Sequence, residues 1–164
     1  MPILIEKYNS SHQAAVVEII TTIQQDEYGL PITYADQPDL ANIPEFYDSF
    51  LVATVSGNPV GTIGLKIIDD FAIIRKMFVA KEFRGAAHGG IAKQLLVAIE
   101  EEAREKQITK IYLGTTALFK AAHLFYERNS YLEIRMTDLP ESFPVMKVDT
   151  KFYCKTLPAL VKIF

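Results

Sequence analysis

The sequence predicts an α/β domain in which a mixed, mostly antiparallel sheet is flanked by helices. Three features of the 164-residue chain support this expectation. Short apolar runs alternate with turn residues, one run leads through a glycine-rich loop into a long amphipathic helix, and further apolar runs follow that helix. This order predicts a strand meander followed by strand–loop–helix–strand, which gives a mixed sheet with helices on its faces.

The expected strands are runs rich in branched and aromatic residues. In chain order they cover residues 3–8, 50–55, 60–68, 71–79, 110–115, 131–137 and 148–157. The second and third strands are separated by residues 56–59, Ser-Gly-Asn-Pro, whose turn chemistry predicts an antiparallel hairpin.

The expected helices are segments in which apolar residues recur with helical spacing. They cover residues 10–23, 91–106 and 120–128. Ser10, followed three residues later by Gln13, predicts a capping box at the start of the first helix. Proline and glycine residues between positions 28 and 49 predict a loop that can contain one short helix.

A single domain is expected over residues 1–157, because a chain of this length builds one core. Residues 158–164 form an unusually apolar tail. We expect this tail to dock on the domain or on a second copy of the chain, and the second arrangement would make the protein a homodimer.

Composition argues against several classes of function. The net charge of −3 leaves no overall basic field for a nucleic acid. The single cysteine, Cys154, cannot form an internal disulfide, and no cluster of residues has metal-site spacing. The N-terminus lacks a signal-peptide pattern, and no apolar run is long enough to predict a membrane span. We therefore expect a cytoplasmic protein that binds no metal and no membrane.

The most informative segment is residues 77–96, in which a strand leads into a glycine-rich loop and then into a helix. Glycines allow the backbone to approach a ligand closely. The first N–H groups of the helix lack partners within it and lie at the positive end of its dipole. The segment therefore predicts a phosphate site. Three side chains can add positive charge to it: Lys81, Arg84 and His88.

Two nucleotide-binding patterns match this loop poorly. Gly85 and Gly90 have the spacing of a nucleoside triphosphate loop, but Ile91 and Ala92 replace the required lysine and hydroxyl residue. The three-glycine dinucleotide pattern is also absent. For the glycines alone, a helix-start turn that binds nothing remains an alternative.

Two segments resemble the GCN5-related N-acetyltransferase (GNAT) family. Its central motif is a strand ending in Tyr/Phe-Val, then Arg/Gln-x-x-Gly-x-Gly/Ala and a helix with paired leucines. The matching residues are 78–79, 83–85, 90–92 and 95–96. Arg84 lies six residues before Gly90, where the family usually has three, which indicates a three-residue insertion. Residues 121–131 resemble the family's later motif, with Ser130 in place of glycine and Tyr131 in place of phenylalanine.

The resemblance implies a GNAT-like acyl-CoA N-acyltransferase fold, with acetyl-CoA as the cosubstrate. It also implies that the pantetheine arm pairs with the strand backbone like an added strand. Phe119 replaces an asparagine that often contacts the cofactor, so that contact is not carried over. The cofactor-binding residues implied by the motif and its loop are Met77, Phe78, Val79, Arg84, Gly85, His88, Gly89, Gly90, Ile91 and Ala92.

Tyr126 is the candidate catalytic residue. A thioester attacked by an amine expels a thiolate whose conjugate acid has a pKa of about 8.5, and a phenol with a pKa of about 10 can protonate it. The alternative is that Tyr126 packs against the sheet. The general base is unassigned, because Ile73 occupies the position where many relatives place a glutamate. Asp69, Asp70 and the acids of residues 26–48 are all open candidates.

Residues 24–50 contain six acidic residues, several aromatic residues and no lysine or arginine. In this family the region tends to wall the acceptor site, so we expect a small, cationic amine as acceptor, such as a polyamine, amino sugar or amino-acid derivative. An ordinary solvated loop is the alternative. For the whole protein, the alternative to an enzyme is a non-catalytic acyl-CoA sensor with the same fold.

Overall fold

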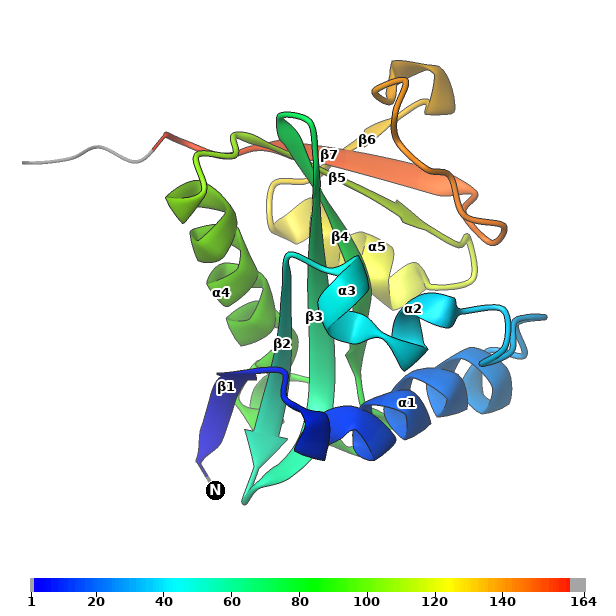
Figure 1. Cartoon of the computed structure of the whole chain (residues 1–164), viewed down its shortest axis with the longest axis vertical. Helices are drawn as coiled ribbons and strands as arrows, with labels where there is room; N and C mark the ends of the chain where they lie inside the picture. The colour runs from blue at the N-terminus through cyan, green and yellow to red at the C-terminus, as the bar shows by residue number, and fades with distance from the viewer. Residues whose placement is uncertain (1, 160–164) are drawn as a thin grey trace, which may run out of the picture.

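A computed structural model describes residues 2–159 and contains one sheet of seven strands in the order β1-β2-β3-β4-β5-β7-β6 (Figure 1). Within these residues β4 and β5 are parallel, and the other neighbouring strands are antiparallel. The expected mixed, mostly antiparallel sheet with flanking helices is therefore confirmed.

The elements follow one another in the expected order. The strands are β1 (Ile3–Lys7), β2 (Ser49–Val55), β3 (Asn58–Ile68), β4 (Phe71–Val79), β5 (Lys110–Thr115), β6 (Leu132–Ile134) and β7 (Lys151–Thr156). The α-helices are α1 (Gln13–Thr21), α2 (Pro38–Ala41), α3 (Ile43–Phe46), α4 (Ile91–Glu105) and α5 (Lys120–Arg128). The other helical turns are η1 (Ser10–His12), the π-helical η2 (Thr22–Glu27), η3 (Lys81–Phe83), η4 (Ala86–His88) and η5 (Met136–Asp138).

Two expectations about the N-terminal half were wrong in detail. The cap of the first helical segment is Asn9 rather than Ser10, because its Oδ1 accepts the Ser11 N–H at 2.9 Å. Residues 28–49 hold two short helices, α2 and α3, where the sequence suggested one. Pro38 and Pro44 lie in their first turns, where a helix has no use for the missing N–H.

The last two strands are shorter than expected because local turns interrupt the chain. Asp138 accepts the Arg135 N–H at 3.1 Å and closes η5, so the strand expected over residues 131–137 is reduced to β6. Asp149 closes a second turn by accepting the Met146 N–H at 2.9 Å, and β7 begins after it.

The expectations about the apolar tail, a homodimer and the membrane concern features that the described residues cover only in part. Residues 160–164, most of the apolar tail, lie outside the described residues, so docking of the tail and homodimer formation stay predictions. Among residues 2–159, no helix is long and apolar enough to cross a membrane.

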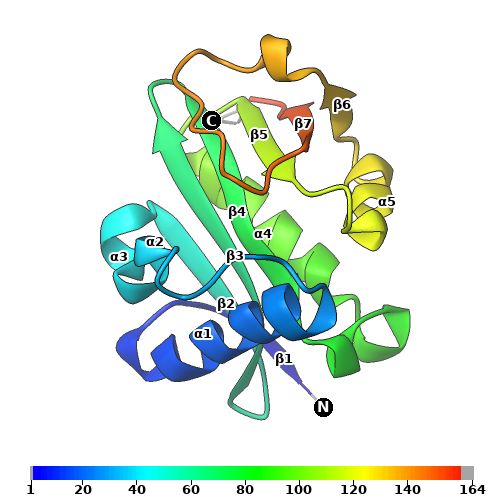
Figure 2. The same ribbon diagram turned by 90° about the vertical axis from the view of Figure 1, so that its right-hand side faces the viewer.

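Helices cover both faces of the sheet (Figures 1 and 2). On one face α4 buries Leu95, Leu96 and Ile99 against β2, β3 and β4. On the other face α1 packs with α2 and α3, and buries Val16 and Ile20 in a separate apolar cluster. Each helix therefore contributes an apolar face to a closed core, and the strands between them are held at fixed positions.

The sheet opens between its two parallel strands. β4 and β5 pair only at Ala72–Ile111 and Ile73–Tyr112, and they separate beyond these residues. The other edge of β4 stays paired with β3 as far as Val79. The β5-facing edge of residues 74–79 consequently has no strand partner, and the site described next lies there.

Candidate active site

A cavity of about 280 Å³ lies beside the free edge of β4, with α5 opposite. Its lining is mainly apolar. The lining residues are Ile23, Tyr28, Met77, Phe78, Val79, Arg84, Gly85, Ala92, Phe119, Ala121, Ala122, Phe125 and Tyr126. An unpaired strand edge offers N–H and C=O groups in an extended row, so this cavity can hold an extended ligand that carries amides of its own.

The glycine-rich loop borders the cavity and runs through η3 and η4. Gly85, Gly89 and Gly90 have φ angles of +95°, +85° and +62°, a region that L side chains rarely adopt. Between Gly85 and Gly89, within the span where the insertion is expected, Ala86–His88 form the separate turn η4. α4 begins directly after Gly90.

The first turn of α4 presents unpaired amides. The Gln94 N–H donates to the Gly90 carbonyl at 3.1 Å and begins the helical hydrogen bonding, and Gly90 has no side chain that could cap the helix. The N–H groups of Ile91, Ala92 and Lys93 have no partner among the described residues. They lie at the positive end of the helix dipole, which makes them suitable for a pyrophosphate.

The structure separates the ten predicted cofactor-binding residues into two groups. Those that line the cavity are Met77, Phe78, Val79, Arg84, Gly85 and Ala92. Of the others, Ile91 is 1% exposed and its side chain belongs to the core, and Gly89 and Gly90 shape the loop. His88 is exposed in η4, and its ring contacts Phe83 instead of lining the cavity.

Arg84 forms an ion pair that the sequence did not reveal. Its Nη1 and Nη2 donate to the two carboxylate oxygens of Glu27 at 2.5 and 2.7 Å, and its Nε donates to the Val79 carbonyl at 2.8 Å. Hydrogen bonds from Arg84 are the main cause that lowers the pKa of Glu27. The pair ties the loop to η2, and Arg84 is still 35% exposed at the edge of the cavity.

We expect Gly89→Ala to destabilise the protein more than the matched control Gly29→Ala. Both glycines have positive φ, +85° and +60°, so alanine costs about 1 kcal/mol at either position. At position 89 the new Cβ would also lie 2.6 Å from Ile3 Cδ1, the end of a side chain that must shift, whereas Gly29 has nothing within 4 Å. Urea unfolding should show a loss of about 1 kcal/mol for Gly29→Ala and a somewhat larger loss for Gly89→Ala. Equal losses would mean that the contact with Ile3 does not change the free energy of unfolding.

A second cavity, of about 120 Å³, adjoins the first and extends toward α2 and residues 143–149. The residues common to the two linings are Met77, Phe78, Phe119, Ala122 and Tyr126. Phe119 contacts Tyr28 and Phe78 edge-on, with ring centroids 4.6 and 6.1 Å apart. The residue that replaces the expected asparagine is thus part of the wall between the cavities.

Tyr126 has a free hydroxyl at this junction. Its ring is packed between Tyr131 and Tyr153, whose hydroxyls donate to Glu100 and Glu127, each at 2.7 Å. Among the described residues the Tyr126 hydroxyl has no hydrogen-bond partner, yet it is not sealed in the core. Because the side chain is 6% exposed, burial raises the pKa of Tyr126 and keeps the phenol protonated.

A bulge in β4 brings two cations to the same face of the sheet. Lys76 and Met77 lie opposite the single residue Ile63 of β3, and Lys76 has a φ of +54°. Neighbouring residues of a regular strand point to opposite faces. The bulge breaks this alternation, so both side chains lie on one face, where Arg75 interacts with Tyr47 and Lys76 pairs with Asp39, the acceptor of the Tyr47 hydroxyl. Both residues line the smaller cavity.

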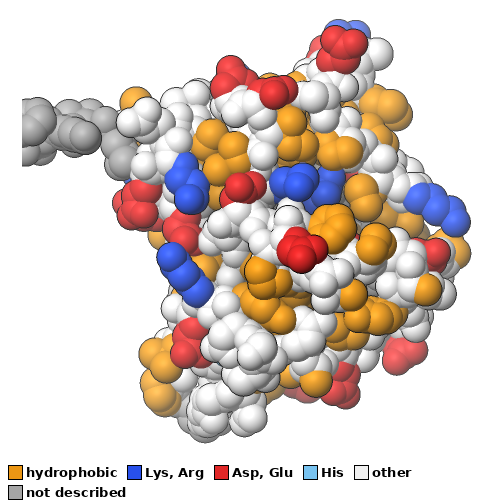
Figure 3. Space-filling model, viewed as in Figure 1, with side chains coloured by type: hydrophobic (Ala, Val, Ile, Leu, Met, Phe, Trp, Pro, Cys, Tyr) orange, Lys and Arg blue, Asp and Glu red, His pale blue; other side chains and the backbone are white. Residues whose placement is uncertain are grey.

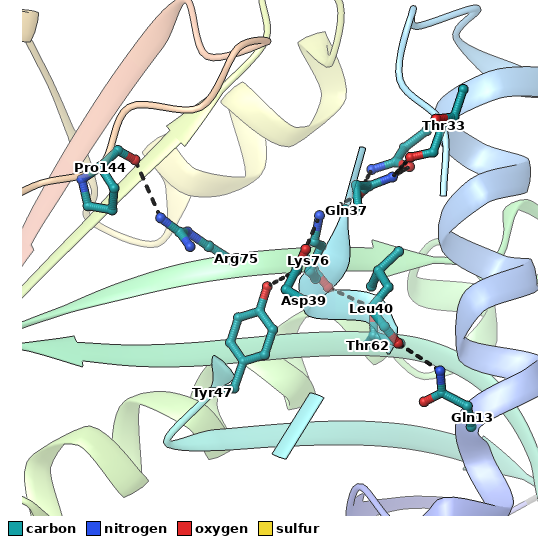
Figure 4. Close-up of polar contacts among 11 residues, drawn as sticks. Gln13, Thr33, Gln37, Asp39, Leu40, Tyr47, Thr62, Arg75, Lys76 and Pro144 are labelled. Carbon is teal, nitrogen blue, oxygen red and sulfur yellow. Dashed lines mark hydrogen bonds and ion pairs between the residues drawn. The ribbon is translucent and has the colours of Figure 1, made fainter. Parts of the chain in front are cut away.

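Lys76 is neutralised by a buried network, shown in Figure 4. Its Nζ lies 3.6 Å from Asp39 Oδ2, and the Tyr47 hydroxyl donates to the same oxygen at 2.5 Å. Lys76 also donates to Gln37, which exchanges hydrogen bonds with Gln24. Burial lowers the pKa of Lys76, and the opposing carboxylate of Asp39 acts to raise it. The network fixes α2 and η2 against β4.

Comparison with known proteins decides the family. The sequence model described as the acetyltransferase (GNAT) family matches residues 17–131, more than half of the chain. The chain belongs to this family. A GNAT acetyltransferase of Staphylococcus aureus Mu50 superposes with a TM-score of 0.91 at 39% identity, covering 96% of this chain and 100% of that chain.

Curated relatives of this GNAT chain include two kinds of protein. The uncharacterized N-acetyltransferase YjgM of Escherichia coli is 30% identical over 132 residues, which are 73% of this chain and 76% of YjgM. Human N-acetylaspartate synthetase is 33% identical over 107 residues, which are 61% of this chain. The chain spans about a third of the length of the N-acetylaspartate synthetases that it matches.

The acidic acceptor wall expected for this GNAT chain is not present as predicted. Residues 24–50 do contribute to the smaller cavity, through Gln24, Leu30, Ile32 and Asp39. Asp39 is the one member of the six acids that lines it, and its charge is paired with Lys76. On the face shown in Figure 3, acidic and basic side chains are interspersed and form no acidic surface.

One feature of the sequence could have predicted the second cavity. Arg75 and Lys76 are adjacent cations inside a strand whose other residues, from Phe71 to Val79, are apolar. Charged residues are almost never buried without partners, so such a pair points to a buried acid or a ligand. Asp149, which also lines this cavity, had no comparable signal because it follows an irregular segment.

Proposed function

We propose that the protein is an acetyl-CoA-dependent N-acetyltransferase that acts on a small amine. The observation that carries this proposal is the free hydroxyl of Tyr126 at the junction of two cavities, one bordered by unpaired amides and the other by charged side chains. The name of the N-acetylaspartate synthetases states that they make an N-acetylated amino acid, which supports a small amine as acceptor.

The residues around the larger cavity fit acetyl-CoA. The amides of Ile91, Ala92 and Lys93, together with Arg84, would hold the pyrophosphate. The backbone of Met77 and the N–H of Val79, on the edge that β5 leaves unpaired, would pair with the pantetheine amides, while the Val79 carbonyl accepts the Arg84 Nε–H. When bound, acetyl-CoA supplies an activated acetyl group and a thiolate leaving group.

Tyr126 acts as the general acid in this proposal. Burial keeps its phenol protonated, and its hydroxyl has no competing acceptor among the described residues. The proton is therefore held for a thiolate formed at the junction of the cavities. The amine approaches from the smaller cavity and attacks the thioester directly, with no covalent acyl-enzyme.

Calorimetry and a thiol-release assay test the proposal together. We expect acetyl-CoA to bind with a Kd between about 1 μM and 1 mM, as is usual for enzyme substrates. ATP, which has the phosphates but no pantetheine, is the control ligand and should bind more weakly. Free thiol should appear when acetyl-CoA is mixed with a panel of amines that contains spermidine, glucosamine and L-aspartate.

The outcomes distinguish the enzyme from a sensor of the same fold. Binding of acetyl-CoA followed by thiol release with at least one amine supports the enzyme. Binding without release across a wide amine panel would indicate an acyl-CoA sensor. Failure to bind acetyl-CoA at all would overturn both.

A further inference from the structure

The smaller cavity holds two charged groups that acetyl transfer to a simple amine does not require. Lys76 and Asp39 neutralise each other, so they leave no charge for a ligand. Arg75 and Asp149 remain. They come from separate parts of the chain, β4 and the segment before β7, and among the described residues they form no ion pair with each other within 4.0 Å.

The Arg75 guanidinium has more N–H donors than its two protein partners use. A guanidinium carries five N–H donors. The Arg75 Nη2 donates to the Pro144 carbonyl at 3.4 Å, a long hydrogen bond, and the guanidinium also interacts with the Tyr47 side chain. Figure 4 shows it pointing away from the Lys76–Asp39 pair and toward Pro144. Within residues 2–159 no carboxylate forms an ion pair with it, so its planar donor face is available to an anion.

Asp149 lies on the β5 side of the same cavity. Its Oδ2 accepts the Met146 N–H at 2.9 Å, and its carboxylate lies against Gly114 of β5. A Cβ at position 114 would be 2.6 Å from this carboxylate, so glycine is what leaves room for it. Burial raises the pKa of Asp149, which makes the carboxylate a better proton acceptor than an exposed one.

We propose that the smaller cavity binds its acceptor as an amino-acid zwitterion, with the carboxylate on Arg75 and the ammonium group on Asp149. The two charges attract each other across the cavity without forming an ion pair, and they match the two charges of such a molecule. The cavity of about 120 Å³ limits the acceptor to a small one. A polyamine or an amino sugar carries no carboxylate and would leave Arg75 without an anion in direct contact. This inference rests on the proposed acetyl transfer and names the acceptor class for the same site.

In this arrangement each proton that the ammonium group loses has an acceptor. Asp149 takes one proton from the ammonium group, and the freed amine forms the N–C bond as the C–S bond breaks. Tyr126 protonates the leaving sulfur, and the second proton lost by the nitrogen restores the phenol. Asp149 then releases its proton to solvent, so one proton is released for each acetyl group transferred.

Matched acceptor pairs test this inference. Each pair is an amino acid and the amine that lacks its α-carboxylate: L-aspartate with β-alanine, L-glutamate with 4-aminobutyrate, and L-alanine with ethylamine. For at least one pair we expect kcat/KM to favour the amino acid by about 10- to 100-fold, the effect of losing a charge-assisted hydrogen bond. Arg75→Gln should reduce that ratio at least tenfold.

Controls separate binding from folding. Arg135→Gln removes an exposed arginine that pairs with Asp138 outside both cavities, and it should keep the wild-type ratio. Asp149→Asn should lower kcat/KM for both members of a pair. The wild-type ratio needs no variant, so the test survives if Arg75→Gln does not fold.

Several results would overturn the inference. These are a wild-type ratio near one for every pair, faster turnover of spermidine or glucosamine than of any amino acid, or an Arg75→Gln variant that keeps the preference. In each case thiol is still released with some amine, and only the acceptor class is wrong. If acetyl-CoA does not bind, the proposed function fails first.

Discussion

Replacing Tyr126 with phenylalanine is expected to lower kcat by about 100-fold or more while the Kd of acetyl-CoA changes little. General acid catalysis contributes about 10²- to 10⁴-fold, and phenylalanine removes only the hydroxyl that would protonate the sulfur. The ring is retained, so its contacts with Tyr131 and Tyr153 are preserved. Steady-state kinetics and calorimetry on the same protein preparation measure the two quantities.

Tyr153→Phe is the matched control for this variant. It removes a neighbouring hydroxyl that donates to Glu127 and lies outside both cavity linings. We expect its kcat to stay close to that of the wild type. If Tyr126→Phe releases thiol as fast as the wild type, Tyr126 is not the general acid. Packing of its ring against Tyr131 and Tyr153 would then be the role of this residue.

Lys76→Met is expected to destabilise the protein by about 3 kcal/mol or more, which is a large part of the stability of a typical domain. The side chains of Lys76 and Asp39 are only 10% and 11% exposed, so the variant leaves a buried carboxylate without its cation. Urea unfolding at neutral pH measures the loss. Lys151→Met breaks the exposed pair with Glu133 and should cost less than about 1 kcal/mol.

A double variant distinguishes pairing from simple loss of packing. Asp39→Asn keeps the shape and leaves an oxygen that can still accept the Tyr47 hydroxyl. Combined with Lys76→Met it removes both charges, so the double variant should lose clearly less than the sum of the two single variants. Additive losses would show that the two side chains act independently in the folded state.

The order of the elements could be predicted from the sequence because each depends on its own residues. The Ser-Gly-Asn-Pro turn predicts the hairpin of β2 and β3, and residues 91, 95, 96 and 99 predict the buried face of α4. The glycines also pointed correctly to a loop before α4, and three of them, Gly85, Gly89 and Gly90, have positive φ. These features are local, and local preferences agree with the fold here.

The charged part of the site could not be predicted in the same way. The bulge at Lys76 has no glycine to signal it, so the alternation rule would place Arg75 and Lys76 on opposite faces of β4. The Arg84–Glu27 pair joins residues far apart in the chain, and either residue alone has the composition of a solvated surface. Segment 139–149 has no periodicity that could place Asp149.

The short parallel junction between β4 and β5 has a consequence for the order in which the molecule assembles. Strands β1 to β4 form a meander in which β2, β3 and β4 are joined by tight turns, so these pairings require little loop closure. β5 reaches β4 only after residues 80–109 have folded back as loop and helix. Half of the sheet can therefore exist before either cavity does. We therefore expect the two cavities to form late in folding, when the second half of the chain docks beside β1 to β4.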